Sequence, residues 1–323
     1  MSNTTQQTES LSGSQIVTIC VYLAMFLVGV IGNGLVVFVT AFKMKSTVNS
    51  IWFLNLAIAD VFFALAPIMR IVLISGKSFE HVLFQLLSFI TELNMFASVF
   101  FLTVISLDRC LCTWLVVWAQ NKRTLVKARI ICTFVWLLSI CCSLPFVMHF
   151  FNKNLNSTSL FTYRFSVGFL LPFLVIVSAY MAIALRVKRL KKGKLFRPFR
   201  LIVALVLVFF LCWFPYHIHK LLNALNAVEN NQNASVREII SKSTHFVICL
   251  TYVHSCVNPI LYVFICEEYK QKLKQSLLLV LETTFAEEHL EAKKEDKMHH
   301  SHPFQLPRQE TNHVQNLSQC DLF

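Results

Sequence analysis

A charged pair, Asp108 and Arg109, closes a long apolar run that begins near residue 94. An acid next to a base is unusual at the end of a soluble core helix, but it is understandable if the run crosses a bilayer and the pair lies at its water-facing mouth. Ionisable groups there are costly, pair with one another and are functional by default. The alternative is a simple stop-transfer charge at a helix end, and these two residues alone leave both interpretations open.

A second group of polar residues lies deep inside apolar runs, where each side chain needs a partner. Asp60 is the most demanding of them, because a lone carboxylate in hydrocarbon must be satisfied by side chains of other helices. We expect a polar cluster at mid-membrane that joins Asp60 to Asn33, Ser98, Ser255 and Asn258.

Four prolines also fall inside apolar runs, namely Pro145, Pro172, Pro215 and Pro259. Each removes one backbone hydrogen bond, so each can kink its helix and act as a hinge. For any single proline, a fixed packing kink is the preferred interpretation.

The composition is that of a membrane protein. Hydrophobic residues make up 56% of the chain and charged residues 14%, with a mean hydropathy of +0.60, whereas soluble domains are near half apolar and a quarter charged. The net charge of +12 is concentrated in particular loops, which indicates membrane topology rather than nucleic-acid binding. The 11 cysteines are spaced neither as a disulfide framework nor as a zinc site.

The apolar runs predict an all-α membrane protein with a seven-helix bundle. Each run is close to or above the ~20 residues that a spanning helix needs, and the runs cover residues 16–42, 51–74, 84–112, 128–150, 161–187, 199–222 and 244–266. Residues 1–15 form a polar tail without the features of a cleavable signal peptide. The membrane domain is therefore predicted as 16–266, followed by a helix at 267–281 and a tail at 282–323.

The loops predict an N-terminus outside the cell. Lysines and arginines gather after the first, third and fifth runs, which the positive-inside rule assigns to the cytoplasm. Three glycosylation sequons, at Asn3, Asn156 and Asn233, then all fall on the outer side.

The segment after the seventh run has an amphipathic pattern. Tyr269, Leu273 and Leu277 form an apolar stripe, and neighbouring lysines are available for lipid headgroups. We expect a short helix along the inner leaflet, and a disordered, solvated tail beyond it.

Several motifs occur in order, one per run, and together they resemble the rhodopsin-class G-protein-coupled receptors. They are Gly32-Asn33, Leu56-Ala57 with Ala59-Asp60, Asp108-Arg109-Cys110, Trp136, Pro172 with Tyr180, Cys212-Trp213-Phe214-Pro215 and Asn258-Pro259 with Tyr262. The finer pattern is similar to the chemoattractant branch of formyl-peptide, chemerin and anaphylatoxin receptors. It is carried by residues 42–49, 52–57, 108–110, 117–124, 197–200, 209–213 and 258–264.

The resemblance implies a mechanism and partners. Asp108 would hold Arg109 at rest, and activation would release Arg109 toward a G protein while the sixth run swings about Pro215. Tyr180, Asn258, Pro259 and Tyr262 would support the open state, and Trp213 would respond to the ligand. The implied partners are a peptide or lipid chemoattractant, a heterotrimeric G protein of the inhibitory class, arrestin and the lipid bilayer of the plasma membrane. No cofactor or metal is expected.

The departures from the family concentrate on the predicted outer side. Relatives have a disulfide between the third run and the second outer loop, but here Phe84 takes one position and the loop at 149–160 has no cysteine. By resemblance, the ligand pocket is expected to hold Glu92, Arg164, Tyr216, His217 and Lys220. A Glu92–Arg164 ion pair could bind a zwitterionic or peptide ligand, or could pair with itself when the pocket is empty.

One departure is internal. His254 stands where the family usually has asparagine beside a sodium-binding Asp60. It could pair with Asp60 in place of the ion or pack as a neutral core residue, and we favour the neutral residue because burial opposes charging.

Three other classes of function compete with a signalling receptor. The missing disulfide and the short loop favour, as an alternative, a receptor-like scavenger that binds a ligand without G-protein signalling. A seven-span enzyme would need several His, Asp or Glu residues that converge in the membrane, and Asp60 with His254 are too few. Transport is disfavoured because no inverted repeat of spans is detectable.

Overall fold

The protein is described by a computed structural model that covers residues 12–74, 80–151, 157–189, 200–228, 234–265, 269–275 and 278. Within these ranges the chain is helical and contains no strand. The chain divides into two compact units, Met1–Lys274 and Gln275–Phe323. All elements below belong to the first unit, and the described residues of the second, Gln275 and Leu278, are helical.

The helices follow one another along the chain, with two short π-helical segments marked η. In order they are α1 (Gly13–Phe38), η1 (Val39–Lys43), α2 (Val48–Ala64), α3 (Ala66–Ile74), α4 (Glu80–Trp114), α5 (Val116–Lys122), α6 (Leu125–Phe151), α7 (Ser157–Phe165), η2 (Ser166–Leu170), α8 (Leu171–Arg189), α9 (Arg200–Val228) and α10 (Ala234–Ile265).

Seven helical stretches in the described part are long and apolar enough to cross a membrane, which confirms the predicted seven-helix bundle. They are Gly13–Lys43, Val48–Ile74, Val82–Trp114, Leu125–Met148, Thr158–Arg189, Arg200–Leu225 and Arg237–Val263. The last helix begins at Ala234, well before the predicted residue 244. Polar residues such as Arg237 and Glu238 form its first turns, so hydropathy alone placed its start too late.

Local sequence explains where the first two spans begin. Ser12 accepts a hydrogen bond from the Gln15 backbone, and the Gln15 side chain accepts one from Ser12 in return. Thr47 and Ser50 form the same reciprocal cap at the start of α2. Such capping boxes satisfy two N–H groups that a helix start would otherwise leave unpaired.

A proline explains the break in the regular helix of the fifth span. Pro172 has no N–H, so the carbonyl four residues before it receives no helical hydrogen bond. Just before it, the Leu171 N–H bonds to the Ser166 carbonyl, five residues back, and residues 166–170 form the π turn η2. Pro145, Pro215 and Pro259 lie inside α6, α9 and α10.

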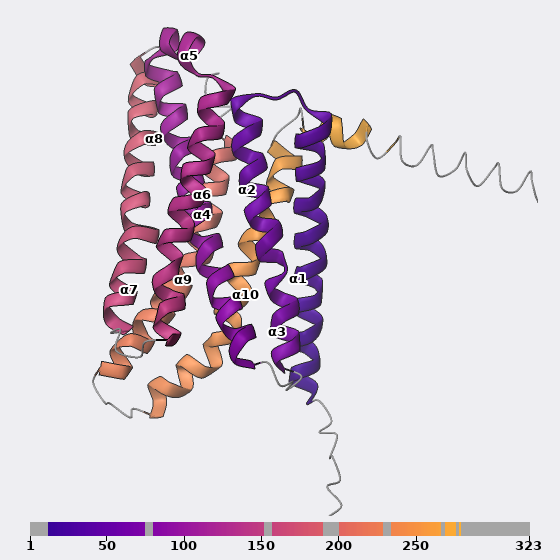
Figure 1. The fold of residues 1–323 in the computed structure, drawn as a ribbon, viewed down its shortest axis with the longest axis vertical. Helices are drawn as coiled ribbons and strands as arrows, with labels where there is room; N and C mark the ends of the chain where they lie inside the picture. The colour runs from indigo at the N-terminus through magenta and orange to yellow at the C-terminus, as the bar shows by residue number, and fades with distance from the viewer. Residues whose placement is uncertain are drawn as a thin grey trace, which may run out of the picture. The chain divides into compact units, whose positions relative to one another are not determined.

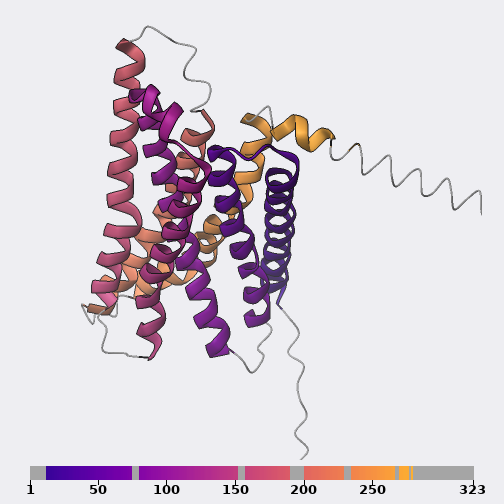
Figure 2. The same cartoon turned by 45° about the horizontal axis from the view of Figure 1, so that its top comes forward.

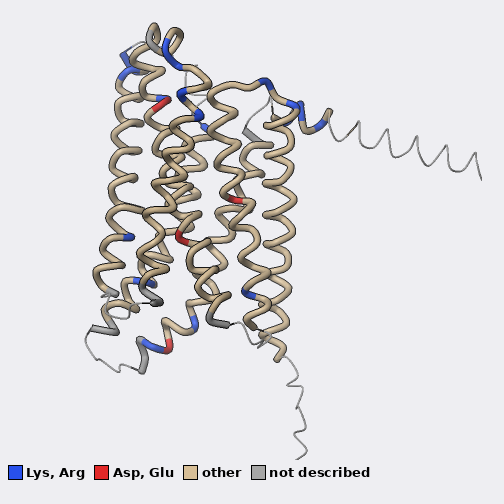
Figure 3. Tube along the Cα trace, viewed as in Figure 1, with Lys and Arg blue, Asp and Glu red and all other residues tan. Residues whose placement is uncertain are grey.

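Helix α4 lies at the centre of the bundle and contacts α2, α3, α6, α8 and α9. Figures 1 and 2 show the long helices running side by side, with α5 at one end of the bundle. We call this the α5 end and the other the pocket end. In Figure 3 the Lys and Arg segments gather mainly at the α5 end, as the positive-inside rule requires of a cytoplasmic face.

The helix predicted after the seventh span is described in part. Residues 269–275 are helical, whereas Leu277 lies outside the described residues. The Tyr269 ring is 4% exposed and its centroid lies 6.2 Å from that of Tyr262 in α10. Its placement along a membrane surface stays a prediction.

Candidate functional site

At the α5 end, the expected Asp108–Arg109 ion pair is present but long, and Asp108 has a second, closer partner. Asp108 receives two hydrogen bonds from Arg123, from Nε to Oδ1 and from Nη2 to Oδ2, each 2.8 Å long. Arg109 Nη2 approaches the Asp108 carboxylate only to 3.9 Å. The bidentate partner of Asp108 is therefore the arginine that follows α5, not its sequence neighbour.

Asn49, at the start of α2, joins the two arginines. Its Oδ1 accepts a hydrogen bond from Arg109 Nη2 and a second one, of 2.5 Å, from Arg123 Nη2. Burial alone would lower the pKa of Arg123, but the hydrogen bonds and the charge of Asp108 outweigh it and raise that pKa above its usual value. Because arginine side chains stay protonated in proteins, the cluster of Asp108, Arg109 and Arg123 carries a net charge of about +1.

The other residues of the predicted activation switch are spread along the inner faces of α8, α9 and α10. Tyr180 packs against a small cluster of Ile183 and Val187. Tyr262 is 2% exposed, with its ring centroid 5.4 Å from that of Phe53. Tyr262 is buried in the bundle interior, whereas Tyr180 is half-buried.

The mid-membrane cluster forms around Asp60, which is fully buried. Its carboxylate accepts hydrogen bonds from Asn258 at 2.7 Å and from Asn94 at 3.2 Å. The Ser255 hydroxyl donates to the Asp60 backbone carbonyl at 3.2 Å, and Asn33 donates to the backbone carbonyl of Ser255 at 3.0 Å. Four helices are therefore joined by polar contacts at this level, namely α1, α2, α4 and α10.

Two residues predicted for this site, Ser98 and His254, make no hydrogen bond to Asp60 in the structure. Ser98 is fully buried, and its hydroxyl has no hydrogen-bond partner among the described residues. The His254 ring packs edge-on against Phe209 and Trp213, with centroid distances of 5.3 and 6.3 Å. The geometry is that of an aromatic core residue, in line with the interpretation favoured above.

An aromatic path leads from this level toward the pocket end. Trp213 is fully buried, and its ring lies edge-on to that of Tyr216 with centroids 5.5 Å apart. The Tyr216 hydroxyl donates to Glu92 Oε1 at 3.2 Å. His254, Trp213, Tyr216 and Glu92 are thus in unbroken contact.

The predicted ion pair of the pocket is present, and it is closed on itself. Arg164 donates from Nε to Glu92 Oε2 at 2.9 Å and from Nη2 to Glu92 Oε1. Glu92 is 1% and Arg164 7% exposed, and the guanidinium also lies 4.3 Å from the centre of the Phe146 ring. Because each charge is neutralised by the other, the pair adds no net charge to the pocket.

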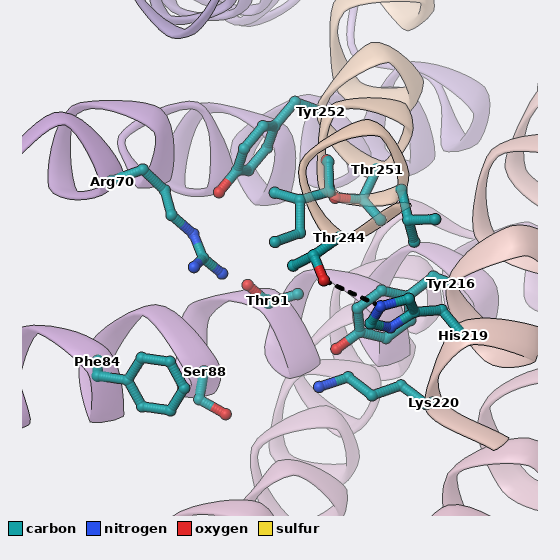
Figure 4. A pocket seen from close by; sticks show the side chains of 12 residues that line it. Arg70, Phe84, Ser88, Thr91, Tyr216, His219, Lys220, Thr244, Thr251 and Tyr252 are labelled. Atoms are coloured by element: carbon teal, nitrogen blue, oxygen red, sulfur yellow. Dashed lines mark hydrogen bonds between the residues drawn. The ribbon is translucent and has the colours of Figure 1, made fainter. Parts of the chain in front are cut away.

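A cavity of about 80 Å³ opens next to this pair at the pocket end (Figure 4). Arg70, Lys220 and His219 supply its nitrogen groups. The remaining lining residues are Phe84, Ser88, Thr91, Tyr216, Thr244, Val247, Ile248, Thr251 and Tyr252. Glu92, Arg164 and His217 are not among them, although the sequence placed all three in the pocket.

The cavity has a positive character. Arg70 and Lys220 extend into it from α3 and α9 in Figure 4, and its described lining contains no carboxylate. The Lys220 ammonium lies 5.3 Å from the centre of the Tyr216 ring. His219 Nε2 forms a hydrogen bond of 3.1 Å with the Thr244 hydroxyl. Hydroxyl groups and apolar walls surround the two cations, an arrangement suited to an anionic group joined to an apolar body.

His217 lies behind the cavity wall. It is 1% exposed, and neither of its ring nitrogens has a hydrogen-bond partner among the described residues. Its ring packs against Phe165 and Phe169 at centroid distances of 5.8 and 4.8 Å.

The structure describes some of the residues that were predicted to lie on the outer side. Phe84 lines the cavity, and the nine described cysteines are all free thiols. The sequons at Asn3, Asn156 and Asn233 lie outside the described residues, so their glycosylation stays a prediction.

Four residues of these sites escaped the sequence analysis, namely Asn49, Arg70, Asn94 and Arg123. Arg70 carried a usable signal, because a charge inside an apolar run calls for the same explanation as Asp60. Asn94 carried a weaker one as an amide in the middle of the apolar run of α4. Asn49 and Arg123 stand in polar surroundings at helix ends, where the sequence does not distinguish them from solvated residues.

Comparisons with known proteins agree with the geometry. The family described as "7 transmembrane receptor (rhodopsin family)" matches residues 32–262. The chain is 38% identical over 293 residues to the C3a anaphylatoxin chemotactic receptor of Danio rerio, covering 85% of this chain and 79% of the relative. It is 34% identical over 325 residues to Chemerin-like receptor 1 of Homo sapiens, covering 90% and 83%. Prostaglandin D2 receptor 2 of Mus musculus is 34% identical over 291 residues, covering 81% and 71%.

Proposed function

Because this chain belongs to the rhodopsin family of seven-transmembrane receptors, in its chemoattractant branch, we propose that it reports an extracellular ligand with an anionic end to a G protein of the inhibitory class. Coupling to heterotrimeric G proteins at the plasma membrane is general for the family. The proposal adds the ligand chemistry, the G-protein class, arrestin as a further partner and an N-terminus outside the cell.

One observation carries the ligand chemistry: Arg70 and Lys220 share a cavity whose described lining contains no carboxylate. Arg164, the other cation nearby, is already neutralised by Glu92. An incoming anion would therefore meet two uncompensated positive charges at a partly desolvated site. Charge-assisted hydrogen bonds are about twice as strong as neutral ones.

The volume and the walls of the cavity further restrict which kind of ligand fits it. A volume of about 80 Å³ is well below the roughly 300–1,000 Å³ of sites that enclose a drug-sized ligand. It admits one end of a ligand, while the rest lies toward the pocket mouth. Phe84, Val247 and Ile248 provide apolar walls. A carboxylate on an apolar body fits this description, whether it ends a peptide or a lipid acid.

The aromatic path connects the cavity with the mid-membrane level, from which α9 continues to the α5 end. A ligand bound beside Lys220 and Tyr216 would press on Trp213, which is packed against Phe209 and His254. Pro215 lies within the same helix and offers a hinge. A ligand that favours one of two helix arrangements shifts the population between them, which is what signalling across the bundle requires.

The test uses the intact chain in cells, with inhibition of cyclic AMP as the readout and surface display verified separately. Peptides with a free C-terminal carboxylate are compared with their amides, and lipid acids with their methyl esters. We expect only the free acids of one series to act. Arg70→Gln and Lys220→Gln should each raise the half-maximal concentration by about tenfold or more, and Arg237→Gln, an exposed arginine of α10, should leave it unchanged.

Arg109→Ala should abolish the response while surface display persists. A response that amides and esters evoke equally well would refute the anionic ligand. Uptake of a free acid by displayed chain, with no G-protein response, would instead support the scavenger alternative that the absent outer cysteine pair suggests.

A further inference from the structure

Both carboxylate oxygens of Asp108 accept hydrogen bonds from an arginine that follows α5. Arg123 approaches it side-on, with two parallel hydrogen bonds of 2.8 Å to the two carboxylate oxygens. This fork geometry is the strongest arrangement that a guanidinium and a carboxylate form. The Asp108 and Arg123 side chains are 12% and 20% exposed, so water screens the pair only partly.

Arg109, in contrast, is held by a neutral acceptor. Its Nη2 donates to the side-chain oxygen of Asn49, and its distance to the Asp108 carboxylate, 3.9 Å, exceeds hydrogen-bond length. Its Nε is buried without a hydrogen-bond partner among the described residues. A hydrogen bond to an amide oxygen is weaker than one to a carboxylate, so Arg109 is held less firmly than an ion pair with Asp108 would hold it.

We propose that Arg123 is a positioning residue for the receptor switch: it withholds Asp108 from Arg109 and thereby leaves Arg109 ready for release toward the G protein. The inference rests on the proposed signalling function. Arg123 does not itself contact the G protein in this scheme. It acts through Asp108, and Asn49 holds the two arginines beside each other by accepting from both.

The position of Arg123 adds a second consequence. It is the C-cap residue of α5, so the same ion pair fastens this short helix to α4. Leu115, Val116 and Val117 of the α5 region are half or more exposed. Apolar contacts alone hold such a helix weakly. The Arg123–Asp108 pair is thus its main polar attachment among the described residues.

The decisive experiment measures signalling without agonist in cells that display equal amounts of each variant. In Arg123→Gln the Asp108 carboxylate becomes free to pair with Arg109, so agonist-independent signalling should fall by about fivefold. In the double variant Asp108→Asn/Arg123→Gln that carboxylate is gone, and signalling should return to at least the wild-type level. Arg129→Gln, an exposed arginine of α6, should behave as the wild type does.

A merely structural role for Arg123 predicts a different pattern, because the second substitution would then add damage and not restore signalling. An unchanged signal in Arg123→Gln, or a fall that Asp108→Asn does not reverse, would overturn the proposal. Arg123→Lys, which keeps the charge but not the fork, should give an intermediate level.

Amide hydrogen exchange of α5 in the purified receptor provides a readout that does not depend on signalling. Arg123→Gln and Asp108→Asn should accelerate exchange at residues 116–122 equally, and the double variant no further, since each variant loses the same Arg123–Asp108 ion pair. If agonists evoke nothing from the wild type, the proposed function fails, and this measurement still decides whether Arg123 and Asp108 act as a pair. Unequal or additive acceleration would refute the pairing.

Discussion

The buried ion pair of Glu92 and Arg164 allows a prediction whose size follows from its surroundings. Glu92 is 1% and Arg164 7% exposed, and the carboxylate accepts two hydrogen bonds from Arg164 and one from Tyr216. Glu92→Gln keeps the shape and an acceptor oxygen but removes the negative charge. Arg164 is then a buried cation without a counter-charge, and breaking such a pair costs about 3–5 kcal/mol of folding free energy.

The assay is thermal unfolding of the purified receptor in detergent, followed by the reaction of buried cysteines such as Cys142 and Cys212 with a thiol-specific fluorophore. A loss of about 3–5 kcal/mol should lower the apparent melting temperature by on the order of 10 °C. Glu238→Gln is the matched control, because Glu238 pairs with Lys242 at 2.5 Å while both side chains are more than half exposed. It should change stability by less than about 1 kcal/mol.

The double variant Glu92→Gln/Arg164→Gln separates charge from packing. Without either charge the site has no buried ion to compensate, so stability should return to within about 1 kcal/mol of the wild type. If Glu92→Gln melts with the wild type, or if the double variant is no more stable than the single one, mutual neutralisation is wrong. Arg164 would then be available to a ligand, and the argument that assigns the anion to Arg70 and Lys220 would lose its basis.

Three further predictions concern packing and use the same melting assay. A Cβ at Gly29 would lie 2.9 Å from a side-chain atom of α2, so Gly29→Ala should destabilise the bundle by about 1–3 kcal/mol. Gly34→Ala is the control: a Cβ there would meet nothing within 4 Å, so the change should be neutral or stabilising by up to about 1 kcal/mol. His217→Phe should stabilise by about 1–3 kcal/mol, because it replaces two buried nitrogens that lack partners with apolar atoms; a loss of stability would show that these nitrogens are satisfied. Trp136→Phe removes the 3.0 Å hydrogen bond from Nε1 to Asn55 and should cost about 1 kcal/mol, with a neutral result contradicting this.

The spans were predictable because a bilayer imposes one strong rule on the backbone. Every N–H and C=O in hydrocarbon must be paired within the helix, so length and hydropathy reveal the helices directly. The rule weakens at α10, whose first turns around Glu238 and Lys242 are polar. The partners of Asp60 were predictable in part for a related reason, since few polar residues in apolar runs are available to satisfy a buried carboxylate.

The details of pairing were not predictable from sequence. Asn94 was missed because polar residues such as Thr91, Glu92 and Asn94 fall on different faces of α4, so the sequence does not reveal which face meets Asp60. The partner of Asp108 was missed because adjacency suggested Arg109, whereas the bond to Arg123 depends on how the chain turns back after α5. Side chains that are neighbours in sequence diverge on a helix, and contacts with a loop follow from its path rather than from spacing.

The π turn η2 has a consequence for how such receptors diverge. It holds one residue more than a regular helical turn, so everything before it, including Arg164, is turned by about 100° relative to an uninterrupted helix that leads into Pro172. At Gly168 the turn passes so close to α4 that an added Cβ would lie 2.7 Å from Met95. Deletion of one residue here would restore regular helical phase and bring a neighbour of Arg164 to face Glu92. A single-codon deletion would thus remove the charge that the fifth span presents to Glu92, because the neighbours Tyr163 and Phe165 are uncharged.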